Sequence, residues 1–243
     1  MKKILLLFLL TAFSMMMFGD WLVEVKVEGM EYEHNAQLEM ALLLETIHND
    51  VAQYDNTDKY IWKTNEGSNG SYNIERWDQL QDLVTSLLHR EGYSFVGIYT
   101  KNWTKGNTLI PFIYIEDRFT DPDAEGNPEN IGQRNFDLVK NESLLAKAFN
   151  DGQGYFTTNA SRLIETGFGK NEARDYQLEA GVRGYFAYPL KNGETTIGLL
   201  VIATKEPGIT EDQYFRITQY GEAAVWLVVQ TVDLLAHPEK LGY

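Results

Sequence analysis

The sequence contains no cysteine, and this absence excludes several kinds of chemistry. Without cysteine the chain can form no disulfide, no thiolate metal site and no cysteine nucleophile, and it cannot be anchored as a lipoprotein through an N-terminal cysteine. Histidine is scarce as well, with four in 243 residues and no two at the spacing of metal ligands. We therefore expect no metal centre and no other cofactor.

Basic residues are few relative to acidic ones. The chain has 21 Lys and Arg against 35 Asp and Glu, which gives a formal net charge of −14. Nucleic acids and anionic lipid headgroups bind clusters of Lys and Arg, so neither is expected as a main partner. The simpler interpretation of this acidity is that it keeps the protein soluble.

The motifs of common enzyme classes are also missing. The sequence has no Gly-x-Ser-x-Gly, no Walker motif and no His-Glu-x-x-His, and residues 167–169 (Gly-Phe-Gly) lack the third glycine of a dinucleotide fingerprint. We therefore expect that the protein is not an enzyme.

One acidic segment resembles the start of a calcium loop. Asp121, Asp123 and Glu125 alternate with other residues, but Gly132 stands where an EF-hand has its bidentate glutamate. A solvated turn and an incidental calcium site both remain open for this segment.

The first residues predict export. Lys2 and Lys3 precede an apolar run over residues 4–11, and residues 12–14 (Ala-Phe-Ser) fit the small-x-small cleavage rule. The alternative is an uncleaved anchor over residues 4–19, which is short for a span of ~20 residues. Residues 1–19 are thus a signal peptide or an N-terminal anchor, and we expect the body of the protein in a periplasm.

Hydrophobic periodicity predicts an α+β chain. Apolar residues at three- and four-residue spacing predict helices; these are residues 30–53, 74–90, a shorter helix over 142–150, and a last helix that begins at residue 210. Aromatic and β-branched runs between turn residues predict strands; these runs are 93–101, 108–117, 153–159, 182–190 and 197–204. Pro111 predicts an edge position for its strand, because proline cannot donate to a ladder. Gly198 predicts that a neighbouring group approaches its strand closely.

The stretch 181–205 is the most informative part of the sequence. It reads as two strands joined by a tight turn at residues 191–193 (Lys-Asn-Gly), and the second strand is a nearly unbroken apolar run. Together with the polar residues that follow, it resembles the end of a GAF domain. The match is carried by fold-forming residues: Gly181, Arg183, Pro189, Leu190, Gly193, Ile197, Gly198 and Leu200.

This resemblance implies a fold. A GAF-like (PAS-like) domain is an antiparallel sheet of about five strands with helices packed on one face, and the order of elements fits it over residues 30–236. We therefore expect residues 20–243 to form one GAF-like domain with an N-terminal helical extension. Some GAF-like proteins reduce methionine sulfoxide or attach a bilin, and both activities use cysteines that this chain lacks.

The resemblance also implies a ligand site. In GAF domains small ligands sit against one face of the sheet under two long connections, here residues 118–140 and 160–180. Aromatic walls with a few arginines suit a planar or anionic small molecule. The alternative is that the tyrosines pack the sheet and the arginines neutralise an acidic surface. The candidate residues are Tyr99, Tyr114, Arg118, Arg162, Arg174, Arg183, Tyr185 and Tyr188.

Two classes of function follow. The first is an extracytoplasmic sensory or ligand-binding module that acts without catalysis through a membrane or periplasmic protein partner. The second is a structural or interaction subunit of a cell-envelope assembly that binds no ligand.

The last helix has two apolar faces. One face could cover the sheet, and the other, around Val225, Val229 and Val232, predicts a homodimer or a membrane-protein partner. The alternative is that the first helix covers this second face within the same chain.

Overall fold

The computed structural model describes residues 25–27, 36–52, 60–63, 74–102, 107–116, 135–140, 143–163, 177–178 and 180–236. Along the chain two helices are followed by a hairpin, a helix, a strand, a second hairpin and a last helix, which is the predicted order. The helices are α2 (Ala36–Val51), α3 (Ile74–Glu91), α4 (Leu144–Asp151) and α6 (Glu211–Ala236), with a 3₁₀ turn η3 (Ala160–Arg162).

The described strands form one antiparallel sheet in the order β1-β6-β7-β8-β3-β4-β2, with β5 also paired to β4. The five strands β6, β7, β8, β3 and β4 are the five that the sequence predicts, and β1, β2 and β5 are short additions. The α+β class and the antiparallel sheet are confirmed. The strands are β1 (Val25–Val27), β2 (Tyr60–Lys63), β3 (Phe95–Lys101), β4 (Thr108–Glu116), β5 (Phe136–Asp137), β6 (Gly154–Thr157), β7 (Gly184–Asn192) and β8 (Thr195–Thr204).

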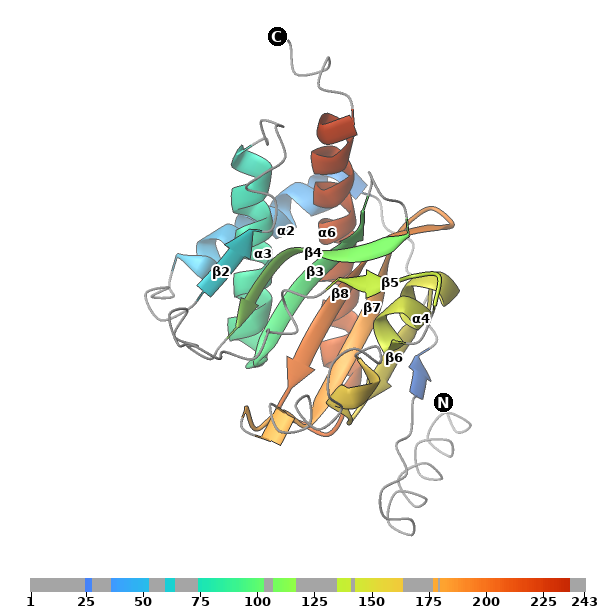
Figure 1. The fold of residues 1–243 in the computed structure, drawn as a ribbon. Helices are drawn as coiled ribbons and strands as arrows, with labels where there is room; N and C mark the ends of the chain where they lie inside the picture. The colour runs from blue at the N-terminus through green and yellow to red at the C-terminus, as the bar shows by residue number, and fades with distance from the viewer. Residues whose placement is uncertain are drawn as a thin grey trace, which may run out of the picture.

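The two faces of the sheet carry separate cores, because successive side chains of a strand point to opposite faces. Val96 and Ile98 of β3 join the core under α2, α3 and α6, which we call the helix face. Phe95 and Tyr99 of the same strand join the core on the other side, together with α4. Three helices thus cover the helix face as expected, and the short α4 lies across the sheet from them (Figure 1).

Local signals in the sequence explain where the helices begin and end. The side chain of Ser143 accepts a hydrogen bond from the amide of Ala146 and starts α4, and Gly152 ends it in the left-handed conformation. Thr210 and Gln213 form a reciprocal capping box at the start of α6, as the sequence predicts.

Gly198 lies in the central strand β8, between β7 and β3. A Cβ built at this position would lie within 3.0 Å of the backbone carbonyl oxygen of Tyr99, closer than real Cβ atoms come. The predicted close approach at Gly198 is confirmed, and the neighbouring group is the backbone of β3.

The edge position predicted for the strand with Pro111 is wrong. β4 pairs with β3 on one side and with both β5 and β2 on the other. β5 pairs with residues 108–109 and β2 with residues 113–116, so Pro111 falls between them, next to a register shift in the β3 ladder. The missing amide of proline is tolerated inside the sheet because the ladder is interrupted at that point.

The second apolar face of α6 is covered in part by the chain itself. Ile217, Ala224 and Leu227 are fully buried, and Val225 and Val229 are partly buried against the helix-face core, to which α2 also belongs. Helix α2 contacts α6 directly. The side chain of Val232 lies outside the described residues. A dimer or partner interface on the remaining surface stays a prediction.

The predicted leader or anchor, residues 1–19, lies outside the described residues. Among the residues that are described, no helix combines the length and the apolar character needed to cross a membrane.

Candidate functional site

The sheet face opposite the long helices carries three of the four tyrosines expected to line a site, together with other aromatic residues. Phe95 and Tyr99 of β3, Tyr114 of β4, Tyr155 of β6 and Tyr185 of β7 all belong to this core, and we call it the aromatic face. They share a face because their strands are in register and antiparallel, so that Tyr155, Ala187, Val201, Gly97 and Tyr114 form one row across five strands. Three of the predicted site residues, Tyr99, Tyr114 and Tyr185, are therefore brought to one surface.

These tyrosines are packed among other side chains. Tyr99 and Tyr114 are fully buried, and Tyr185 is 3% exposed. The ring of Tyr99 meets Phe136 edge-on at 5.8 Å, and Phe95 stacks on Tyr114 at 5.7 Å. The ring of Phe95 also occupies the space that a side chain at position 97 would need, which is why glycine stands there. Within the described residues, the aromatic face is a filled surface.

A polar cluster lies where α4 meets β6. The hydroxyl of Tyr155 donates a hydrogen bond of 2.6 Å to Asp151, the last residue of α4. The ammonium of Lys147 lies 4.9 Å from the centre of the same ring, a cation–π contact. These contacts fix α4 against the aromatic face, which its residues Leu144, Leu145 and Ala148 cover.

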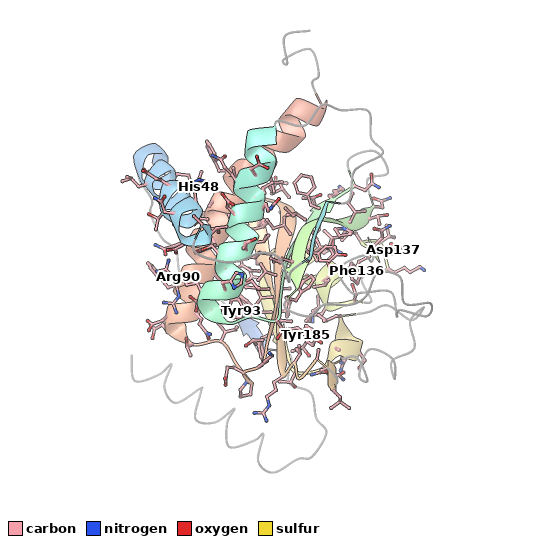
Figure 2. The ribbon with its side chains drawn as sticks, turned by 90° about the vertical axis from the view of Figure 1, so that its left-hand side faces the viewer. His48, Arg90, Tyr93, Phe136, Asp137 and Tyr185 are labelled. Carbon is pink, nitrogen blue, oxygen red and sulfur yellow. The ribbon has the colours of Figure 1, made fainter. Side chains whose placement is uncertain are left out.

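Residues near the ends of both predicted connections belong to the aromatic face. For the first, the structure does not describe residues 117–134; Tyr114 before them and Phe136 after them belong to this core, whereas Ile115 belongs to the helix-face core. For the second, residues 164–176, Leu163 before them and Val182 after them belong to the aromatic face as well. Figure 2 shows Phe136 and Asp137 on the side of the sheet away from His48 and Arg90.

Gln177 joins the two ends of the second connection. Its side-chain oxygen accepts a hydrogen bond from the amide of Ala160 at 3.0 Å. Its side-chain nitrogen donates to the carbonyl oxygens of Thr158 at 2.7 Å and of Val182 at 3.2 Å. One amide therefore ties the end of β6 to the approach of β7.

The predicted arginines divide into two groups. Arg162 in η3 and Arg183 before β7 are exposed, near the strand ends that Gln177 holds together. Arg118 and Arg174 lie outside the described residues, as do the acidic residues 121, 123 and 125. No group of side chains that could hold a metal ion occurs in the part of the chain that is described.

Tyr188 does not share a surface with the other three tyrosines. It lies on the helix face, where its ring packs over α6 and would collide with any side chain at Gly221, at 2.6 Å from a Cβ there. It meets Tyr214 of α6 edge-on at 6.2 Å. Burial raises the pKa of Tyr188 and raises the pKa of Tyr214 to about 12. Tyr188 therefore belongs to the packing of α6.

Sequence reasoning missed Phe136, Tyr155 and Gln177. Tyr155 and Phe136 sit in short strands, where alternation is too brief to assign a face. No local pattern around Gln177 indicates its three hydrogen bonds, because its partners lie up to 19 residues away.

The order of elements along the chain and the antiparallel sheet agree with the GAF arrangement, which the resemblance of residues 181–213 implies. The fold is GAF-like. No protein-family model and no curated protein matches the sequence.

Solved structures similar to this GAF-like domain include three of different kinds. The GAF domain of an Acinetobacter phosphoenolpyruvate-protein phosphotransferase has 12% identity and a TM-score of 0.48, over 81% of this chain and 96% of that one. Residues 122 to 287 of a methyl-accepting chemotaxis protein have 14% identity and a TM-score of 0.47, over 77% and 96%. A type II free methionine-R-sulfoxide reductase from Thermoplasma acidophilum has 13% identity and a TM-score of 0.46, over 65% and 95%. Likeness of this degree concerns the fold alone.

Proposed function

We propose that this chain is an extracytoplasmic GAF-like sensory module that binds a small planar or anionic molecule at the aromatic face. The observation that carries the proposal is that residues near both ends of each long connection, Tyr114 and Phe136 for the first and Leu163 and Val182 for the second, belong to the core of this one face. Binding residues are often found on loops that a rigid scaffold positions, and here the scaffold is the five-stranded centre of the sheet. The module has no catalytic step in this proposal, since no motif in the sequence supplies an activated nucleophile.

The chemistry of the surroundings suits such a ligand. The aromatic rings of Tyr114 and Tyr185 are buried in this face, and they would offer flat, apolar contact area with a polar edge only to a ligand that displaces the side chains packed on them. Arg162 and Arg183 are exposed beside the same strands, where a guanidinium can bind a carboxylate or phosphate with two hydrogen bonds. A planar anion would place its ring toward the tyrosines and its charge toward the arginines.

Transmission to a membrane or periplasmic protein completes the proposal. The three hydrogen bonds of the Gln177 side chain, which we call the Gln177 clasp, tie the end of the second connection to the residues before β7. β7 in turn packs against α6 through Tyr188. A change at the aromatic face would thereby reach the helix face, where a partner or a second copy of the chain could respond.

Native mass spectrometry of the protein purified from a periplasmic fraction tests ligand binding. We expect a retained small molecule, or a melting temperature that rises with a panel of aromatic carboxylates. Arg183→Gln should weaken binding about tenfold or more, because a charge-assisted pair is lost. Tyr188→Phe, on the opposite face, is the matched control and should bind as wild type does. A chain with no retained mass and no response to the panel would overturn the proposal.

The second candidate is a structural subunit of an envelope assembly that uses the fold without a ligand. The burial of Tyr99 and Tyr114 among Phe95 and Phe136 favours it, because a filled face needs no small molecule. Its expected result is the absence of any ligand together with a stable complex after chemical crosslinking in the native envelope.

A further inference from the structure

Helix α2 is held against α3 by apolar contacts and by two polar bridges. Nδ1 of His48 lies 2.8 Å from a carboxylate oxygen of Asp82, and Arg90 donates a hydrogen bond of 3.2 Å to Asp50. Histidine titrates near neutral pH and arginine does not, so only the first bridge changes its charge between pH 5 and 8. The apolar contacts of α2 with the helix-face core come from the buried Leu44 and Ile47 and the partly buried Met40 and Leu43.

The charges around His48 favour its protonated form. On its own helix, Glu45 lies one turn earlier and Asp50 is engaged by Arg90. On α3 the facing groups are Asp82, which makes the hydrogen bond, and Asp78 one turn before it. From α6, Tyr220 reaches α3, where its hydroxyl lies 2.8 Å from Oγ of Ser86, and this tyrosine is neutral at these pH values.

We propose that α2 is a pH-responsive cover of the helix face, which docks more tightly on α3 when His48 is protonated. Loosening of α2 would uncover the apolar residues of α3 and α6 beneath it. The proposal rests on the proposed function only in placing the domain outside the cytoplasm, where the pH follows the surroundings.

The direction of the effect follows from the pair. Asp82 raises the pKa of His48, through the hydrogen bond first and through its charge second. The stabilisation is therefore fully present below the ordinary histidine value of about 6.5, and it is lost as the pH rises through the higher folded-state value. The His48 side chain is 74% exposed, so solvent screens the pair and we expect an effect of about two- to fivefold on the docking equilibrium.

Hydrogen exchange of the full chain, measured at pH 5.8 and pH 7.8 and corrected for intrinsic rates, tests the proposal. We expect the protection of α2 peptides to be about two- to fivefold higher at the lower pH, while α4 peptides serve as an internal reference. The difference should shrink in 1 M NaCl, because salt screens an exposed pair.

Two substitutions on the surface of α2 separate the mechanism from general loosening. His48→Gln keeps a hydrogen-bonding side chain without the charge and should abolish the pH difference. Asp50→Asn is the matched control: it weakens the bridge that does not titrate, so it should lower α2 protection at both pH values and leave the pH difference in place.

A second measurement is the pKa of His48, followed by NMR in the wild type and in Asp82→Asn. This measurement tests the pair directly and does not depend on a change in the docking of α2. We expect the value to fall in the variant. A pH difference that survives His48→Gln, or wild-type protection equal at both pH values, would overturn the proposal. Ligand binding at the aromatic face is measured separately, so failure of the proposed function would be seen in that assay and not in this one.

Discussion

Replacing Gly198 tests whether the close approach of the β3 backbone to the central strand β8 limits the stability of the fold. A Cβ at this position meets the carbonyl oxygen of Tyr99, and the next nearest side-chain atom is Cδ1 of Leu190 at 3.6 Å. The first neighbour is backbone, and β3 is held by ladders to β8 on one side and to β4 on the other. The carbonyl group of Tyr99 therefore cannot rotate away as a side chain could, and β3 and β8 must separate locally.

The size of the effect can be bounded from two opposing terms. Overpacking in a well-ordered core costs about 1–3 kcal/mol. Replacing glycine lowers the entropy of the unfolded chain, which returns about 0.4–1 kcal/mol. We expect Gly198→Ala to lower the free energy of unfolding by about 1–2 kcal/mol and Gly198→Val to lower it further. At about 2–4 °C per kcal/mol for a domain of this size, the alanine variant should melt roughly 2–8 °C below wild type.

Urea unfolding followed by circular dichroism, with calorimetry for the melting temperature, measures both variants. Gly208→Ala is the control, because no atom lies within 4 Å of a Cβ there and the backbone is not left-handed. It should stay within about 0.5 kcal/mol of wild type or gain slightly. If Gly198→Ala were as stable as the control, the contact with Tyr99 would not be limiting and the reasoning would be refuted.

Three further predictions concern the helices and the second connection. Arg216→Met should destabilise the protein by about 3–5 kcal/mol in urea unfolding, because it leaves the carboxylate of Glu91 buried without its ion pair; the Glu91 side chain is 5% exposed. The added change Glu91→Leu should recover most of that loss, and no recovery would refute the pairing argument. Gln177→Ala removes three hydrogen bonds and should cost about 1–3 kcal/mol, with faster proteolysis between residues 163 and 177; unchanged proteolysis would count against the clasp. Val229→Glu should convert a wild-type dimer into a folded monomer in sedimentation; loss of the cooperative melt would instead assign Val229 to the core, and a monomeric wild type would end the homodimer prediction.

The second hairpin and the last helix could be predicted because their signals are local. The sequence predicts the turn at residues 191–193, and the structure has it at Gly193 and Glu194, because Lys191 and Asn192 still pair with β8. The apolar run of β8 fits a strand covered on both faces, and Thr210 with Gln213 marks the start of α6. The position of β4 could not be predicted in the same way. Pro111 shows only that one ladder hydrogen bond is missing. Two short strands pair with β4 on either side of the proline, β5 before it and β2 after it, and neither strand was firmly predicted.

The face of each tyrosine could have been assigned more fully from the sequence. Tyr185 and Tyr188 are three residues apart on one strand, and an odd separation places them on opposite faces. Only Tyr185 could therefore share a surface with Tyr99 and Tyr114. The packing of Phe136 against Tyr99 could not have been found, because it depends on β5 returning to β4 after a long connection.

Pro111 has a mechanical consequence for β4. The strand is in effect two short segments, one paired with β5 and the other with β2, and the proline removes a hydrogen bond between them. β5 and β2 therefore support different parts of β4, and β3, which pairs with β4 on both sides of the proline, is the strand that joins them. The β5 part is also tied to α4, because the carbonyl oxygen of Leu138, next to β5, accepts a hydrogen bond from Asn150. The part of β4 nearest β5 is thus linked to the helix on the aromatic face, and β2 takes no part in this link.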